Sequence, residues 1–172
     1  MKRRVPRLRQ LLRRLGLWWR CSLRKPFQPV LGGRAMASAE IGRFGERLAA
    51  KWLKRHGRKV LYRNFRGPKG GEVDISCRHG KVLAFVEVKT RTSEAFGRPA
   101  DAVDREKQAL IQRGATEWLR LLGRPVLTFR FDIVEVILTE GRRPEVRVIE
   151  NAFQMPPSDM TGRTKGKKSR KG

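Results

Sequence analysis

Three acidic residues and a lysine stand at sheet positions in residues 70–91, "GGEVDISCRHGKVLAFVEVKTR". Glu72 and Asp74 occur in one apolar stretch, and Glu87 and Lys89 occur in the next. A carboxylate inside a sheet is costly to desolvate unless it meets a cation. Oxygen ligands suit Mg²⁺ or Mn²⁺, and a nearby lysine can orient a water molecule or offset charge on a phosphate. Such a set can hydrolyse phosphodiesters.

The spacing of these residues fits two paired strands. Side chains alternate along a strand, so Glu87, Lys89 and Arg91 share one face. If the strands form a hairpin, Asp74 can approach Glu87 closely enough to share an ion. The alternative is an exposed hairpin with ordinary ion pairs, such as one between Glu87 and Lys89. Because the "ExK" residues lie inside an otherwise apolar strand, the sequence favours a buried, gathered set.

Two helical residues are candidates for the same site. Glu46 lies on the flank of an apolar helical stripe, where it can reach a metal or pair with nearby basic residues. Lys107 lies near the middle of an apolar helical face, so it either extends to the rim or points at the site. Asp132 is expected at the core edge, paired with Arg130 or another base, and the sequence assigns no chemistry to it.

The helices and strands that position these residues are predicted from the periodicity of the apolar residues and from the glycine and proline residues between them. Ser38 is a candidate cap for a helix that ends at Gly57. The order of elements predicts an α/β fold, a mixed sheet with helices on its faces. The expected segments are helices over 38–57 and 100–122, and strands over 59–65, 72–77, 82–90, 127–138 and 145–153.

The charge of the chain favours a polyanionic partner. Its 172 residues include 41 Lys and Arg against 16 Asp and Glu, a formal net charge of +25. The acidic residues all lie within 36–160, whereas residues 1–35 and 161–172 carry 11 and 6 basic residues. Lysine and arginine attract the phosphates of nucleic acid irrespective of base sequence. Nucleic acid is therefore the expected partner.

The ends of the chain are expected to lie outside the globular domain. Residues 1–37 form a basic arm that is either a start-site extension before Met36 or a dispensable segment; a helix in this arm could instead lie on a membrane surface. A single domain is expected over 38–155, and 156–172 read as a disordered basic tail. No apolar run is long enough to span a membrane. Two cysteines without metal-binding spacing favour a reducing, cytoplasmic setting.

Several motifs together resemble one bacterial family. They occur in the order "GRFGERLAAKWLKRHG", "LYRNFRGPKGGEVDI", "AFVEVKTR", "FGRPADAVDREKQ", "RFDIV" and "IENAF". This pattern resembles the YraN-like proteins, a family of predicted nucleases with a restriction-endonuclease-like fold similar to archaeal Holliday junction resolvases. The resemblance covers about 38–153. It implies that Asp74 and Glu87 ligate a metal, Glu46 supports it from the helix, and Lys89 serves the attacking water.

The combined expectation is an endonuclease that needs Mg²⁺ or Mn²⁺ and hydrolyses DNA, with a preference for branched or flapped structures that rests on the resemblance alone. Arg91 and Lys107 are expected to contact nucleic acid, and the resemblance favours a site-facing Lys107. The alternative is a catalytically weak accessory protein that binds nucleic acid. The sequence leaves open whether the substrate is DNA or RNA, whether the site holds one metal ion or two, and whether the active form is a homodimer.

Overall fold

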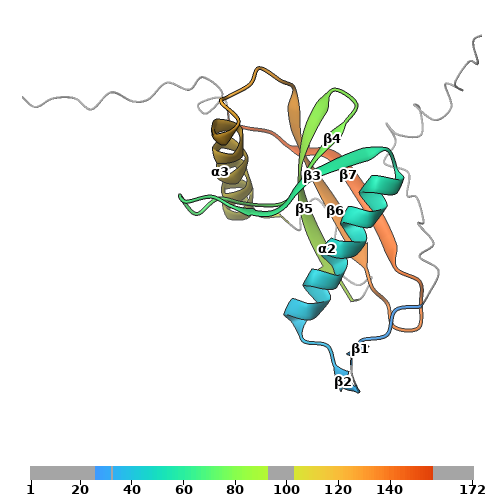
Figure 1. Ribbon diagram of the computed structural model, residues 1–172. Coiled ribbons are helices and arrows are strands. Elements are labelled where there is room, and N and C mark those ends of the chain that lie inside the picture. The colour runs from blue at the N-terminus through green and yellow to red at the C-terminus, as the bar shows by residue number, and fades with distance from the viewer. Residues whose placement is uncertain (1–25, 32, 93–102, 157–172) are drawn as a thin grey trace, which may run out of the picture.

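The computed structural model describes residues 26–31, 33–92 and 103–156. Five strands form one mixed sheet in the order β3-β4-β5-β6-β7, and two helices pack on it. Figure 1 shows α2 and α3 against different parts of this sheet. The predicted α/β class is confirmed. Two strands of two residues each, β1 (Val30–Leu31) and β2 (Arg34–Ala35), pair with each other before the main sheet. The following elements are α2 (Ser38–Arg55), β3 (Arg58–Arg66), β4 (Glu72–His79), β5 (Val82–Arg91), α3 (Arg105–Leu121), β6 (Phe129–Ile137) and β7 (Glu145–Phe153).

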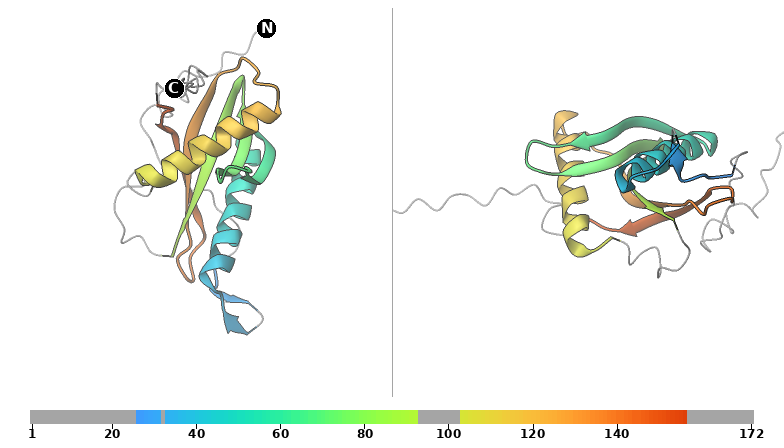
Figure 2. Two further views of the ribbon diagram at one scale, coloured as in Figure 1. Left: turned by 90° about the vertical axis from the view of Figure 1, so that its left-hand side faces the viewer. Right: turned by 90° about the horizontal axis from the view of Figure 1, so that it is seen from below.

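Strand pairing follows from the connections. The strands β3, β4 and β5 form antiparallel hairpins, and β6 pairs with β7 in the same way. The central neighbours β5 and β6 are parallel. Parallel strands need a long crossover, and α3 lies in that connection. The two views of Figure 2 show this helix crossing one side of the sheet.

Alternation along β5 divides the core into two clusters. Ala84, Val86 and Val88 pack in a cluster with the buried face of α2. Leu83 and Phe85 point the other way and pack in a cluster with α3. Because successive side chains of a strand face opposite sides, the two helices cover opposite faces. Glu87 and Lys89 therefore share their face with Phe85, on the α3 side.

The start of α2 differs from the sequence expectation. The N-cap is Ala37, and Ser38 is already the first helical residue, so the predicted cap at Ser38 is wrong. The first turn is acidic, and the Glu40 carboxylate accepts the Ala37 N–H at 2.9 Å and pairs with Arg34. The Glu40 carboxylate thus supplies the N3 part of a capping box, while the N-cap residue Ala37 has no side-chain acceptor for the helix N–H groups.

Part of the segment before α2 packs onto the sheet domain. Phe27 is buried, joins the α2 cluster and contacts the Phe44 ring. Its backbone N–H donates to the carbonyl of Arg142 at 2.7 Å. The domain boundary at 37/38 stays a prediction. Residues 1–25, 32, 93–102 and 157–172 lie outside the described residues, so the predicted start of the second helix at 100 and the predicted disorder after 156 stay predictions. None of the described helices is long and apolar enough to cross a membrane.

Candidate active site

Asp74 and Glu87 meet where β4 and β5 separate. The β4–β5 pairing extends from His79 and Val82 only as far as Ile75 opposite Val86. Beyond that point the Asp74 carboxylate accepts the backbone N–H of Val88 at 2.8 Å. A side chain thus takes a ladder hydrogen bond, which opens the strand pair and brings an acid from each strand to the gap.

Glu87 is almost completely buried, with 3% of its side chain exposed. Its Oε1 lies 3.1 Å from Lys89 Nζ and 3.4 Å from Lys107 Nζ. Its Oε2 is buried and has no hydrogen-bond partner among the described residues. A buried carboxylate oxygen without a partner is costly, so this oxygen is a candidate ligand for a cation. The expectation that the hairpin is exposed is wrong, whereas the Glu87–Lys89 ion pair that this alternative named is present.

The carboxyl group of Asp74 has a strongly raised pKa. Burial and the charge of Glu87 raise its pKa to about 7, against an ordinary value of 3.8, and the charge of Glu46 adds to the rise. The Val88 N–H and the Lys107 ammonium oppose these effects without cancelling them. An acid surrounded by other acids and little water is uncommon away from functional sites.

Lys107 points at the acids, as the site-facing alternative predicts. Asp104 caps α3 by accepting the Lys107 backbone N–H at 2.8 Å, which fixes the first turn of the helix. The Lys107 ammonium donates to Glu72 Oε1. Burial alone would lower the pKa of Lys107, but the hydrogen bond to Glu72 and the nearby acids raise it. The same hydrogen bond, with help from Arg66, lowers the pKa of Glu72. Lys107 is therefore a charged donor at this site.

Two glycines let α3 reach the sheet at this point. A Cβ added to Gly71 would lie 2.2 Å from the backbone nitrogen of Gly114, and one added to Gly114 would lie 2.8 Å from the backbone of Glu72. Backbone therefore meets backbone where α3 crosses the start of β4. This contact holds Lys107 against Glu72.

Glu46 approaches from the other helix. A Cβ added to the neighbouring Gly45 would lie 1.9 Å from Thr90 Oγ1, so α2 and β5 come closer here than any side chain permits. Gly42, which has open space instead, has no such role. The half-buried Glu46 is near enough for its charge to raise the pKa of Asp74. It contributes charge to the acid set, without a hydrogen bond or ion pair to any residue that the structure describes.

A further acid lies beside Lys89, and sequence reasoning missed it. Glu135 stands opposite Lys89 on β6 and is 3% exposed. It pairs with Arg91 at 2.8 Å and with Arg147 of β7 at 3.6 Å. Arg91 is thus held by a buried acid on the face that carries Glu87. An acid within the apolar run "DIVEVIL" was the available signal.

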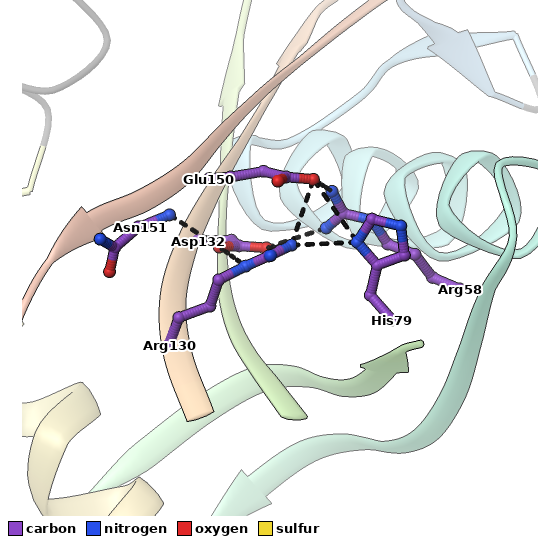
Figure 3. Close-up of polar contacts among 6 residues, drawn as sticks. All are labelled: Arg58, His79, Arg130, Asp132, Glu150 and Asn151. Carbon is purple, nitrogen blue, oxygen red and sulfur yellow. Dashed lines mark hydrogen bonds and ion pairs between the residues drawn. The ribbon is translucent and has the colours of Figure 1, made fainter. Parts of the chain in front are cut away.

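A second charged cluster lies elsewhere on the sheet, around Asp132 (Figure 3). Asp132 is fully buried and accepts from Arg58 at 2.9 Å, from Arg130 at 2.8 Å and from the Asn151 backbone N–H at 3.0 Å. The expected pairing of Asp132 with Arg130 is confirmed. Glu150 also pairs with Arg58 and Arg130. Both oxygens of Asp132 have donors, so this cluster needs no outside ligand.

The acid cluster around Asp74 suits a divalent cation. Asp74 and Glu87 offer carboxylate oxygens, which Mg²⁺ and Mn²⁺ prefer, and no described residue donates to Glu87 Oε2. A cation there would offset the burial and the repulsion from Glu87 that raise the pKa of Asp74. Within the described ranges, no three His, Cys, Asp or Glu residues are already close enough to hold a metal ion by themselves. Water and substrate oxygens would have to complete the shell.

Comparison with known proteins places the chain in a family. Residues 45–136, which include every site residue above except Arg147, match the model of Uncharacterised protein family UPF0102. A UPF0102 protein of Geobacter metallireducens is 41% identical over 121 residues, covering 70% of this chain and 98% of the relative. A UPF0102 protein of Trichlorobacter lovleyi is 43% identical over 128 residues, covering 74% and 98%. The chain therefore belongs to the UPF0102 (YraN) family that its motifs indicate.

Proposed function

We propose that this protein is an endonuclease that depends on a divalent metal and hydrolyses phosphodiester bonds in DNA. The observation that carries the proposal is the pair of acids at the gap between β4 and β5. Glu87 keeps a buried oxygen without a described partner, and the pKa of Asp74 rises to about 7 beside it. Such an arrangement lowers stability unless it serves a ligand.

Each site residue has a separate role in this proposal. Asp74 and Glu87 would hold Mg²⁺ or Mn²⁺, and Glu46 would add negative charge from α2. When bound, the metal would polarise a phosphate oxygen and lower the pKa of a water molecule. Lys89 is partly exposed, with its ammonium 3.1 Å from Glu87, so it can orient that water or offset charge on the phosphate. Lys107 can contact a neighbouring phosphate.

The substrate class rests on charge and on the resemblance. The excess of 41 basic over 16 acidic residues favours nucleic acid. The preference for branched or flapped DNA comes from the similarity to junction resolvases and extends the proposal to substrate shape. A cytoplasmic setting belongs to the same proposal, because Cys77 is free and buried. A homodimer is compatible with it and is left to direct measurement.

One observation favours a second candidate, an accessory protein that binds nucleic acid without cutting it. The Lys107 ammonium already contacts Glu72 and lies 3.4 Å from Glu87 Oε1. It therefore supplies part of the positive charge that a metal would bring. A protein that never binds metal could keep this lysine to neutralise its acids.

A cleavage assay separates the two candidates. The full chain is incubated with labelled duplex, single-stranded, flapped and four-way-junction DNA and with one RNA, in Mg²⁺, Mn²⁺ or EDTA. Glu87→Gln is the test variant, and Glu106→Gln is the control because Glu106 is exposed on α3. The endonuclease proposal expects cuts that need metal, that Glu87→Gln reduces at least about 100-fold and that Glu106→Gln retains. Binding without cleavage by all three proteins would support the accessory role.

A further inference from the structure

The exposed face of α2 carries a row of basic residues that no part of the site explains. Arg43, Arg47, Lys51 and Lys54 are all exposed. At 3.6 residues per turn they fall within an arc of about 80°, and they extend about 16 Å along the helix. Arg55 lies beside the end of the row. We call Arg43, Arg47, Lys51 and Lys54 the α2 basic stripe.

The stripe has no local partner that accounts for it. None of its residues forms an ion pair with a residue of the described chain; the nearest relationships are Arg47 over the Phe44 ring at 5.7 Å and the charge of Arg43 near Glu40. Four like charges at spacings of three and four residues repel one another and weaken an isolated helix. The packing of the opposite face of α2 under the sheet supports the helix despite this cost.

The stripe adjoins the acid cluster. Glu46 lies about 60° round the helix from Arg43 and raises the pKa of Asp74. One rigid helix therefore presents an acid to the candidate active site and a row of cations next to it. A polyanion that follows the stripe would reach Arg43 beside Glu46, where Gly45 packs against Thr90 of β5. This continuity favours nucleic acid over a membrane surface as the occupant.

The chemistry of the stripe favours a duplex. Recognition of single strands commonly uses exposed aromatic side chains on which bases stack. The aromatic residues of α2 do not serve this purpose, because Trp52 is 7% exposed and Phe44 packs against the core. Cations without stacking platforms contact phosphates alone.

We propose that the α2 basic stripe binds the phosphate backbone of a nucleic-acid duplex arm and directs that arm to the acid cluster. This inference rests on the proposed function for the identity of the partner, but binding along the stripe does not depend on cleavage. The stripe supplies contacts that are independent of base sequence, so it sets affinity and orientation rather than sequence preference.

The test compares two variants of the full chain with the same change in charge. The stripe variant is Arg47→Gln, Lys51→Gln and Lys54→Gln. The control variant is Arg78→Gln, Lys81→Gln and Arg120→Gln, at exposed basic positions on other elements. Glutamine keeps a good helix propensity, and thermal unfolding verifies that both variants fold.

Binding to a labelled 30-base-pair duplex and to single-stranded DNA is measured in EDTA across a salt series, with anionic lipid vesicles as a third arm. We expect the stripe variant to bind the duplex at least about tenfold more weakly than the control variant near 100 mM salt. Its slope of log K against log salt should be shallower by about 2 to 3, close to 0.9 for each lost phosphate contact. The loss for single-stranded DNA should be smaller.

Equal duplex affinity and salt slope for the stripe and control variants would overturn the inference. Loss of vesicle binding with DNA binding unchanged would overturn it in favour of a membrane surface, and an equal loss on single-stranded DNA would overturn the duplex assignment. The outcome is separable from the proposed function. If the wild type binds through the stripe but never cuts DNA, the stripe stands and the nuclease proposal fails.

Discussion

The sheet carries two clusters of buried charge that differ in how they are satisfied. Around Asp132, carboxylates and guanidinium groups alternate, and both oxygens of the central acid accept hydrogen bonds (Figure 3). Around Asp74, acids approach one another, and Glu87 keeps an oxygen without a described donor. The first cluster is complete within the described fold, whereas the second keeps an acceptor that no described residue fills and that we propose a cation fills.

This difference contrasts charges that partners within the fold compensate with charges that the described residues compensate only in part. Burying a charge costs several kcal/mol unless partners return the lost solvation. The Asp132 cluster meets that cost with partners from β3, β6 and β7. The Asp74 cluster meets it only in part, through Lys89, Lys107 and one backbone N–H. Substitutions in the two clusters should therefore change stability in opposite directions.

The largest effect is expected from Asp132→Ala. Removing this acid leaves Arg58, which is 4% exposed, and the half-buried Arg130 with Glu150 as the one acid that they still share among the described residues. The free energy of unfolding should fall by about 3–5 kcal/mol, as for other broken buried ion pairs. Urea unfolding of the full chain measures it. A loss below about 1 kcal/mol would show that the Asp132 cluster does not support the fold and would remove the contrast.

A smaller loss is expected from Gly45→Ala, which tests how α2 presents Glu46. The added Cβ would lie 1.9 Å from Thr90 Oγ1, so the helix or Thr90 must shift, at a cost of roughly 2–3 kcal/mol. The matched control is Gly42→Ala on the same helix, which meets open space and should gain up to about 1 kcal/mol from helix propensity. Thermal unfolding compares the two. Equal shifts of the melting temperature for both variants would argue against a close approach of α2 to β5 at Gly45.

A gain in stability is expected from Asp74→Asn at alkaline pH. The folded-state pKa of about 7 exceeds the ordinary value of 3.8, so the folded protein binds more protons than the unfolded chain between these values. Stability from this group therefore falls as the pH rises through that window. Asparagine keeps an oxygen for the Val88 N–H and removes the charge, so the variant should gain roughly 1–2 kcal/mol at pH 8.

The pH dependence of this gain identifies its source. Near pH 4 the acid is protonated in the folded protein, and the difference between Asp74→Asn and wild type should approach zero. Chemical unfolding at pH 4, 6 and 8 follows the difference. Loss of stability at every pH would mean that Asp74 is compensated as Asp132 is, and the comparison between the clusters would collapse.

The smallest effect is expected from Glu135→Gln. Arg91 and Arg147 lose a charged partner but keep a hydrogen-bond acceptor, so stability should change by about 1 kcal/mol or less. Arg91 would no longer be held beside the acid cluster. DNA affinity at fixed salt measures this, with Glu106→Gln as the exposed control. An affinity equal to that of the control would show that Arg91 is structural.

Much of the fold was predictable from local patterns. Alternation and turn residues placed β3, β4, β5, β6 and β7 close to their observed positions, and the hairpin brought Asp74 to Glu87. Lys107 was recognised as a candidate because its helical position conflicted with an apolar face. These features depend on period and spacing, which a sequence displays directly.

Other features depend on contacts between distant segments. Arg58 at the start of β3 reaches Asp132 and Glu150, which are 74 and 92 residues away. Glu135 acquires its role only because β7 lies beside β6 and supplies Arg147. Ser38 was the better capping residue by type, yet the helix is capped at Ala37, whose N–H donates to the Glu40 carboxylate that also pairs with Arg34. Tertiary pairing decides such cases, and no local pattern encodes it.

The central claim is that Asp74 and Glu87 are gathered to hold a divalent cation, and calorimetric titration tests it most directly. Mg²⁺ and then Mn²⁺ are titrated into the full chain at pH 7, in two buffers of different ionisation enthalpy, beside Glu87→Gln and Glu106→Gln. We predict binding to wild type and to Glu106→Gln, with release of a fraction of a proton because Asp74 is about half protonated at this pH. Binding should be lost in Glu87→Gln. No binding to the wild type, or equal binding to Glu87→Gln, would contradict the claim.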